Sequence, residues 1–439
     1  MLQPVRLLPS AFLLAIAVGS VLLMLPASRT GAEAPFVMPA LFTAVSAVCV
    51  TGLITVDTAT FWSPFGQGVI LALIQIGGFG IMTLATMLSL LVRGRLRLRT
   101  RLVTQAETHT LNLGEVSSVV KRVAAIMVIC EAAVGVAVTA RFGLAYDEKW
   151  STALWHGMFH AVSAFNNAGF ALFSDNLTDF VGDAWIMLPL CAAVVLGGIG
   201  FPVLMELLRT AGRPATWTVH TRITVLGSAL LLTVGTVAFL AFEWANPDTI
   251  GSLGFGEKLV AGVTGGVMPR TAGFNTVDYA MVTPETSAVT TVLMFIGGGS
   301  AGTAGGVKVT TFFLLAFVIW TEVSGERDVT VGPRSISGQT QRQALTVALL
   351  GVAAVAAGTL SILVLTDFRL DDVLFEATSA FATVGLSTGI TPELPPAAQL
   401  VLMVLMFVGR VGTITVASAL ALRSRPRLYR LPEERPIVG

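Results

Sequence analysis

Long apolar blocks separated by short polar ones run along the whole chain, which is the pattern of membrane-spanning helices. Apolar runs of roughly twenty residues, the length that crosses a bilayer, occupy 9–28, 65–92, 118–141, 184–208, 222–243, 286–320 (interrupted), 341–366 and 398–422. Between the members of each successive pair lies a half-apolar segment of about twelve residues that ends in glycine, a length that suits a re-entrant helix. The pattern predicts an all-α polytopic membrane protein with eight transmembrane helices.

The four short segments are copies of one another, so the chain contains an internal repeat. Their closing glycines are Gly52, Gly169, Gly273 and Gly385, spaced by 117, 104 and 112 residues. A second glycine-containing landmark follows each of them after 24–28 residues, at 77–80, 197–200, 297–300 and 409–412. We therefore predict four pseudo-repeats of span, re-entrant pore helix, glycine segment and span around one central pore. Their bounds are 1–94; 95–213, which begins with a basic cytoplasmic segment; 214–328; and 329–422, followed by a basic cytoplasmic tail at 423–439.

Composition and charge agree with a membrane protein and predict its orientation. The chain is 54% hydrophobic and 12% charged, with a mean hydropathy of +0.80, whereas a soluble domain is about 25% charged. This balance excludes a soluble globule, a disordered chain, a collagen-like fibre and a disulfide-stapled module. The predicted topology places 19 basic residues on the side of the termini and six on the other, so the positive-inside rule predicts that both termini are cytoplasmic, in the cell's cytoplasmic membrane.

Acidic residues gather on the opposite, outer side, which holds 17 of the 26 in the chain. Asp57, Asp175 and Asp278 follow a repeat glycine by five or six residues. Exposed loops need charge in any protein, and that reading remains open for each residue taken singly. The summed imbalance predicts an outer mouth that concentrates cations.

The four glycine segments, 50–53, 167–170, 271–274 and 383–386, have a chemistry of their own. Non-helical backbone at membrane depth is tolerated only where protein buries it or where it lines a water-filled path. Four equivalent segments around one axis would present a ring of carbonyl oxygens that replaces the hydration shell of a cation. Glycine permits the backbone dihedrals that such a segment needs. Packing glycines in an ordinary helix bundle are the alternative. The predicted ion-binding selectivity filter comprises Val50, Thr51, Gly52, Asn167, Ala168, Gly169, Thr271, Ala272, Gly273, Thr383, Val384 and Gly385.

These segments, together with the glycine-rich stretch 297–308, resemble the Trk/Ktr/HKT superfamily of potassium transporters over nearly the whole chain. The resemblance implies potassium uptake with K⁺ in the filter, because sodium-conducting members tend to carry serine where this chain has Gly52. The chain begins directly on the first repeat, without the two additional spans of TrkH-type chains, and so is most similar to the KtrB branch. That branch implies a homodimer, a cytosolic KtrA-like ring that alone binds nucleotide, stimulation by sodium, no covalent cofactor and no nucleic-acid partner.

A gate is predicted at the landmark of the third and fourth repeats. Residues 297–306 contain six glycines, so the backbone there is poorly committed to helix and suits a mobile loop beneath the filter. Arg410 stands where the other repeats have glycine, and an arginine at this depth costs roughly 2.5–3.5 kcal/mol unless it faces a cavity or a partner. The predicted gate comprises Gly297, Gly298, Gly299, Ser300, Ala301, Gly302, Thr303, Ala304, Gly305, Gly306, Lys308 and Arg410.

Three of the basic residues in or beside these segments have other interpretations. Arg410 could instead form a structural salt bridge with Glu131 or Glu206, and Arg270 is expected to brace the third glycine segment against a carboxylate. Gly306-Val307-Lys308-Val309 lacks the Gly-Lys-Ser/Thr of a phosphate-binding loop.

Enzymatic and carrier functions remain as alternative classes. His156 and His160 share a helix face that could hold a metal, but no third ligand follows. Because no catalytic arrangement appears within the spans, we predict that the protein is not an enzyme. A carrier that uses alternating access at broken helices remains the alternative function, although it favours two large halves over four units.

Overall fold

The computed structural model describes residues 4–31, 37–101, 113–210, 213–326, 328–332 and 334–412. The basic tail at 423–439 and part of the basic segment that follows the first repeat lie outside the described residues. The mostly helical architecture predicted from the sequence is confirmed. The departure is one antiparallel pair of two-residue strands, β1 (Thr330–Val331) and β2 (Arg334–Ser335).

The longer helices fall into four consecutive groups, each with a short helix inside it. The first group is α1 (Pro4–Leu23), α2 (Val37–Cys49), α3 (Thr58–Phe61) and α4 (Pro64–Arg101). The second is α5 (Leu113–Ala145), α6 (Trp150–Phe165), α7 (Ala184–Gly198) and α8 (Phe201–Thr210). The third is α9 (Val219–Glu243), α10 (Phe255–Val267), α11 (Pro284–Phe295) and α12 (Val309–Ser324). The fourth is α13 (Gly338–Leu365), α14 (Leu370–Ala382) and α15 (Pro396–Phe407), extended by a π-helix (Val408–Gly412). Four 3₁₀ turns complete the set: Pro26–Ser28, Thr178–Phe180, Pro214–Thr216 and Thr391–Glu393.

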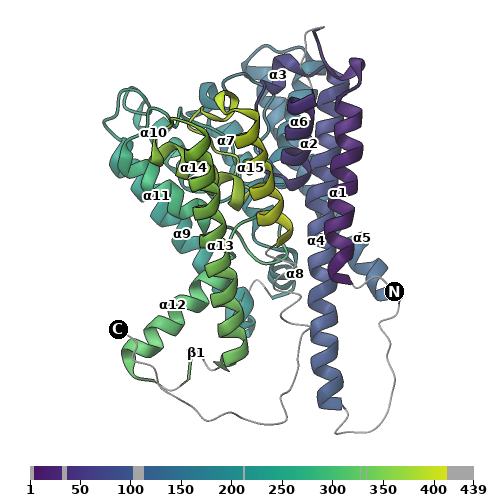
Figure 1. Cartoon of the computed structure of the whole chain (residues 1–439), viewed down its shortest axis with the longest axis vertical. Coiled ribbons are helices and arrows are strands. Elements are labelled where there is room, and N and C mark those ends of the chain that lie inside the picture. Colours follow the sequence, from purple (N-terminus) through teal and green to yellow (C-terminus); the bar gives the residue numbers. More distant parts are fainter. Residues whose placement is uncertain are drawn as a thin grey trace.

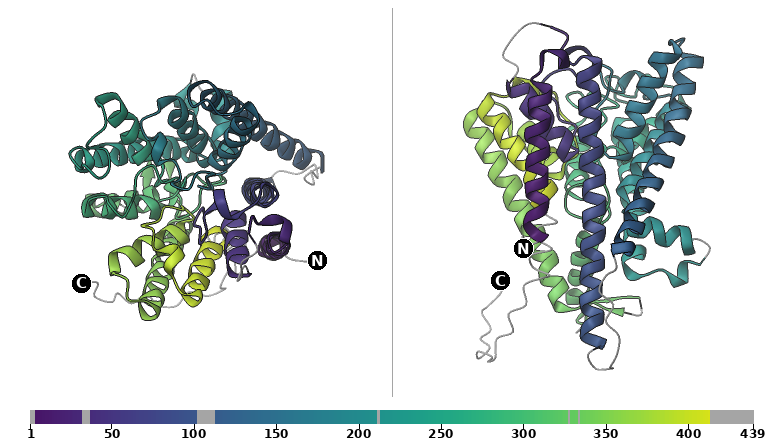
Figure 2. Two further views of the ribbon diagram at one scale, coloured as in Figure 1. Left: turned by 90° about the horizontal axis from the view of Figure 1, so that it is seen from above. Right: turned by 90° about the vertical axis from the view of Figure 1, so that its right-hand side faces the viewer.

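The four groups surround a common centre in chain order. Viewed from above in Figure 2, the purple, blue, teal and yellow-green groups succeed one another around a central region of loops. The short helices α2, α6, α10 and α14 point into this centre, and their last turns are fully buried. The long helices α1, α4, α5, α9 and α13 stand outside and lengthwise (Figure 1). This arrangement buries the ends of four short helices, which need other partners for their last carbonyl groups.

Not every predicted span is long enough by itself to cross a membrane. Among the described residues, four helical stretches qualify by length and composition: Pro64–Thr83, Ser118–Ala145, Val219–Glu243 and Gly338–Leu365. The bent pair α7–α8 would be a fifth. The predicted total of eight transmembrane helices would also need shorter apolar helices, such as Pro9–Leu23 and Pro396–Gly412, to cross the membrane. That total remains a prediction.

The span predicted at 184–208 is not one straight helix, because the chain bends by 102° between α7 and α8. Gly200 lies at the bend with a φ of +97°, a conformation that disfavours residues with a Cβ. The backbone N–H of Phe201 donates to the carbonyl of Ala301 at 3.2 Å, so the glycine-rich loop of the third repeat is fastened at this bend. Tertiary contact with that loop therefore accounts for the break, which hydrophobicity alone does not reveal.

Candidate functional site

The four glycine segments share one unusual backbone conformation. In each segment the closing glycine has a positive φ: +96° at Gly52, +70° at Gly169, +73° at Gly273 and +100° at Gly385. The residue two positions earlier also has a positive φ, although it carries a side chain; these residues are Val50 (55°), Asn167 (59°), Thr271 (68°) and Thr383 (49°). Left-handed conformations are uncommon in non-glycine residues and mark turns, strain or functional sites. Their recurrence at the same place in all four repeats makes the segments equivalent in backbone conformation as well as in sequence.

The four segments close into a ring. A Cβ atom added to any of the four glycines would lie within 3.0 Å of the backbone of the next segment in chain order, and the fourth segment returns to the first. The partners are Ala168 for Gly52, Gly273 for Gly169, Val384 for Gly273 and Thr51 for Gly385. Such close approach leaves no room for a side chain. Glycine is therefore required here by packing as well as by dihedral angle.

Serine side chains at the short-helix ends support three of the four segments. The backbone N–H of Gly52 donates to Ser46 Oγ, and that of Gly385 donates to Ser379 Oγ, each at 3.1 Å. In the second repeat the equivalent Ser163 Oγ donates to the carbonyl of Phe170 at 2.8 Å. The third repeat has Val267 at this position. These serines were not among the predicted site residues, although all three lie six residues before the glycine of their segment.

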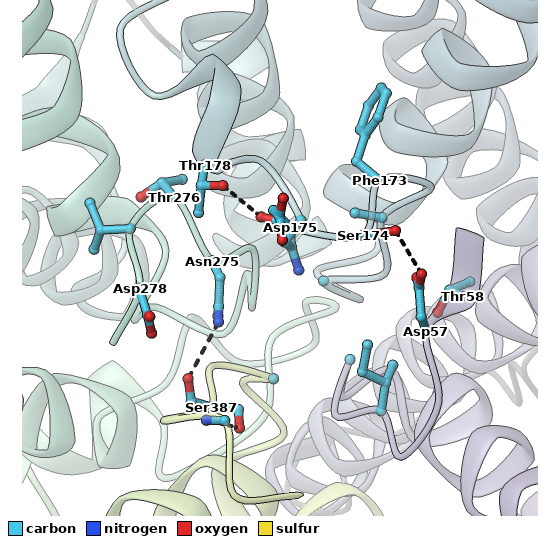
Figure 3. Close-up of a pocket in the computed structure, with 18 of the residues that line it drawn as sticks. Asp57, Thr58, Phe173, Ser174, Asp175, Thr178, Asn275, Thr276, Asp278 and Ser387 are labelled. Carbon is cyan, nitrogen blue, oxygen red and sulfur yellow. Dashed lines mark hydrogen bonds between the residues drawn. The ribbon is translucent and has the colours of Figure 1, made fainter. Parts of the chain in front are cut away.

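A cavity of about 600 Å³ opens at the carboxyl end of the ring. Gly52, Gly169 and Gly385 line its floor, and residues that follow each segment line its wall (Figure 3). The described residues that line the cavity include four aspartates, Asp57, Asp175, Asp248 and Asp278, and neither lysine nor arginine. Asp57 accepts a hydrogen bond from Ser174 Oγ at 2.7 Å, and Asn275 Nδ2 donates to the carbonyl of Ser387 at 3.3 Å, so neighbouring repeats are tied together at the rim. The cavity is therefore an acidic vestibule above the ring.

The second landmark brings the inner helices against the short-helix ends. A Cβ added to the first landmark glycine of repeats one, two and four would lie within 3.0 Å of a carbonyl oxygen four residues before the ring glycine. These pairs are Gly77 with Val48, Gly197 with Phe165, and Gly409 with Phe381. In the third repeat Gly297 meets Gly305 instead, because the glycine-rich loop lies in between. The landmark glycine is thus required for close helix packing in three repeats. In the third repeat it packs against the glycine-rich loop instead.

The loop 297–306 lies against the amino ends of the glycine segments, opposite the vestibule. Thr303 Oγ1 donates to Asn167 Oδ1 at 2.8 Å and approaches the carbonyl of Phe165 at 3.2 Å. A Cβ at Gly305 would lie within 3.0 Å of Thr383 Oγ1. Residues 302–307 are buried, and backbone bonds join the loop to 197–201 of the second repeat. The loop therefore contacts two opposite segments of the ring from below.

Arg410 lies beneath the ring and contacts the loop. Its side chain is 2% exposed, and Nη1 donates to the carbonyl of Thr303. Its Nε and Nη2 atoms have no hydrogen-bond partner among the described residues. It occupies the π-helix that ends the described part of the fourth repeat, and such one-turn bulges are frequent at functional sites. Lys308 Nζ likewise donates to the loop, to Ala304 O at 2.5 Å and Gly305 O at 3.3 Å.

The salt-bridge interpretation of Arg410 receives no support from the carboxylates considered for it. Glu131 accepts hydrogen bonds from Gln75 Nε2 and Asn166 Nδ2, each at 3.1 Å. Glu206 accepts from Thr218 and Thr221 at the start of α9.

The expectation that Arg270 pairs with a carboxylate is wrong. Its Nη2 donates to the carbonyl of Gly297 at 2.9 Å, so it joins the third glycine segment to the start of the loop. A main-chain oxygen is available there because the break in the helix frees it.

The two histidines considered as metal ligands have other partners. His156 Nδ1 lies 3.1 Å from the carboxylate of Glu148. His160 Nδ1 lies 2.7 Å from the carbonyl of His156. Within the part of the chain that the structure describes, no three His, Cys, Asp or Glu side chains lie close enough to hold a metal ion.

Comparison with known proteins places the chain in a family. The family model described as TrkH, cation transport protein, matches residues 10–426. The chain is 36% identical to the Ktr system potassium uptake protein B of Bacillus subtilis, over 99% of this chain and 97% of that protein. It is 35% identical to the potassium/sodium uptake protein NtpJ of Enterococcus hirae, over 100% of this chain and 98% of that protein. The crystal structure of the potassium transporter TrkH from Vibrio parahaemolyticus matches with a TM-score of 0.73 at 17% identity, covering 94% of this chain and 84% of that one. The resemblance stated from the motifs is confirmed: the chain belongs to the TrkH family of cation transport proteins and is a membrane transport protein, not an enzyme.

Proposed function

We propose that this protein carries out potassium uptake across the cytoplasmic membrane, with the ring of glycine segments as its selectivity filter. The observation that carries the proposal is the closed ring of four left-handed segments beneath an acidic vestibule. A dehydrated monovalent cation needs several oxygen ligands around it, and four equivalent backbone segments supply them without an added charge. The names of the two relatives, a potassium uptake protein of Bacillus subtilis and a potassium/sodium uptake protein of Enterococcus hirae, both include K⁺ and favour it as the ion.

The residues beneath the ring, on the side opposite the vestibule, support the proposal of a gate. Arg410 contacts the loop 297–306, and the loop contacts the ring from below, so in this proposal an ion that leaves the segments would pass both. A fixed positive charge repels cations there, and a glycine-rich loop blocks the way while permitting movement. In this proposal the eight predicted spans surround one pore, and both termini face the cytoplasm.

The assembly follows from the relatives and is proposed with the same function. The Bacillus subtilis relative is named as part of a Ktr system, which supports an assembly of more than one component. Within that assembly we propose a homodimer seated on a cytosolic, KtrA-like nucleotide-binding ring. Sodium stimulation belongs to the same proposal. This chain itself would need no covalent cofactor.

Uptake of ⁸⁶Rb⁺ into liposomes containing the purified protein tests the proposal. We expect uptake that K⁺ inhibits at far lower concentration than Na⁺, together with restored growth of a potassium-uptake-deficient bacterium on low potassium. Equal inhibition by K⁺ and Na⁺ would exclude a potassium filter. Uptake that requires a counter-transported solute would favour the alternating-access carrier.

A further inference from the structure

Two buried side chains, His160 and Glu376, occupy the same position in opposite repeats. Each lies nine residues before its ring glycine, on α6 and α14 respectively. Both are 0% exposed, in the interior of the protein, where polar groups are expensive to bury unless they are hydrogen-bonded. The second and fourth segments that they precede face each other across the ring, since each segment contacts the next in chain order.

Each side chain accepts a hydrogen bond from the backbone N–H three residues after the glycine of its own repeat. The N–H of Leu172, three residues after Gly169, donates to His160 Nε2 at 3.3 Å. The N–H of Thr388, three residues after Gly385, donates to Glu376 Oε1 at 3.0 Å. An imidazole and a carboxylate thus perform one task, namely to tie the outer end of a glycine segment back to its own short helix.

The fourth repeat is tied more extensively. Ser387 Oγ donates to Glu376 Oε1 at 2.5 Å, and Thr391 Oγ1 donates to Glu376 Oε2 at 2.7 Å. The carbonyl of Ser387 in turn accepts from Asn275 of the third repeat at the vestibule rim (Figure 3). The Glu376 carboxylate therefore holds 387–391 in place and, through Ser387, the contact between two neighbouring repeats.

His160 is fixed on its other side as well. Its Nδ1 faces the carbonyl of His156 at 2.7 Å, so Nδ1 carries the proton and Nε2 is left as an acceptor. Its ring stacks on Phe173 with centroids 5.2 Å apart and an interplanar angle of 20°. The tautomer and the ring orientation are both set by these neighbours.

The first and third repeats have threonines at this position, and these threonines do not make the tie. Thr264 Oγ1 donates to Ala261 O at 2.8 Å within its own helix. Thr43 Oγ1 is buried and has no hydrogen-bond partner within the part of the chain that the structure describes. This hydrogen bond is therefore made in two of the four repeats, although all four share the same backbone conformation. The threonines of the other two repeats provide matched controls.

We propose that His160 and Glu376 are positioning residues that set the ion selectivity of the ring by fixing the outer ends of its second and fourth segments. This inference rests on the proposed function. Neither residue needs to touch the ion. Without the tie, a buried N–H loses its acceptor, a loss that costs about 1–3 kcal/mol, and the segment is free to move its carbonyl groups. A change of 1.4 kcal/mol in the discrimination between two ions is about tenfold.

The test measures how strongly Na⁺ inhibits ⁸⁶Rb⁺ uptake in liposomes containing the full chain. Glu376→Leu, which removes all the acceptors at similar volume, should lower the Na⁺ concentration that halves uptake by about tenfold. Glu376→Gln keeps an acceptor for the Thr388 N–H and should stay within about threefold of wild type. Thr264→Val should match wild type.

His160→Phe gives an independent result if Glu376→Leu does not fold, because it preserves the aromatic packing while removing the acceptor of the Leu172 N–H, together with the Nδ1–H bond to the carbonyl of His156 within the same helix. It should weaken discrimination in the same direction. A structural role predicts fewer active molecules and an unchanged inhibition ratio, and that outcome in the His160 variant, or in a folded Glu376→Leu protein, overturns the inference. If the wild type itself fails to discriminate, the proposed function is at fault and this inference falls with it. Discrimination in wild type and variants alike refutes the inference alone.

Discussion

The substitution Gly385→Ser is the most direct test that the ring is the selectivity filter, because the atoms that a side chain would contact there are known from the structure. A Cβ built at Gly385 lies 2.1 Å from the carbonyl oxygen of Thr51, whereas a close carbon–oxygen contact is about 3.3 Å. One of the two segments must therefore move by about 1 Å. The residue also has a φ of +100°, a region where a Cβ adds about 1–2 kcal/mol of strain.

The carbonyl that must move belongs to the ring itself, so the strain falls on the ion ligands. We expect the preference for Rb⁺ over Na⁺ to fall by about tenfold or more, the equivalent of about 1.4 kcal/mol. Gly52→Ser should behave similarly, because its Cβ would lie 2.4 Å from the carbonyl oxygen of Ala168. The assay is Na⁺ inhibition of ⁸⁶Rb⁺ uptake in liposomes, expressed as a ratio so that differences in yield cancel.

Gly80→Ser is the matched control. Gly80 lies within α4, and a Cβ there has Phe12 Cε2 at 4.0 Å as its nearest neighbour, an ordinary contact. This variant should transport with wild-type selectivity. Wild-type selectivity in both ring variants would refute the assignment of the ring as the filter, and an equal loss in the Gly80 variant would show that the effect is not local to the ring.

Three further predictions concern the gate, the vestibule and the fold. Arg410→Ala should raise Rb⁺ flux per folded molecule with selectivity unchanged, because it removes a buried charge and the bond to the Thr303 carbonyl; unchanged or reduced flux would contradict the barrier. The double variant Asp57→Asn, Asp278→Asn should take up less Rb⁺ than wild type at low Rb⁺ concentration and low ionic strength, because two charges of the vestibule are removed. The difference between variant and wild type should disappear at high salt, where these charges are screened, and initial uptake rates across a salt series measure this. Glu243→Ala should lower the free energy of unfolding by about 3 kcal/mol, because the buried carboxylate accepts four hydrogen bonds from the loops beside α9. A thermal-unfolding midpoint like that of wild type would exclude a stabilising role for this carboxylate.

The sequence by itself determined the features that repeat. The half-length helices, the four glycines and the second landmark recur in register, and each reflects a local need: a short apolar helix, a left-handed backbone angle, or space for a neighbouring carbonyl. The first two needs involve residues close together in the chain, and the third joins two helices of the same repeat, as in the approach of Gly77 to the carbonyl of Val48. The recurrence of the pattern in all four repeats therefore reveals them. Aligning the repeats would also have revealed Ser46 and its equivalents, and the shared position of His160 and Glu376.

Tertiary structure alone decided how these parts meet. The closure of the ring joins residues more than a hundred positions apart, as in the approach of Gly169 to Gly273. The bend at Gly200 follows from a loop of another repeat, and Arg270 donates to a main-chain oxygen that exists only because a distant helix is broken. The chemical character of a residue limits which partners it accepts, but the packing of separate helices determines which partner comes within reach. Arg410 illustrates the difference: its unusual place in the repeat is visible in the sequence, whereas its contact with Thr303 depends on the folded loop.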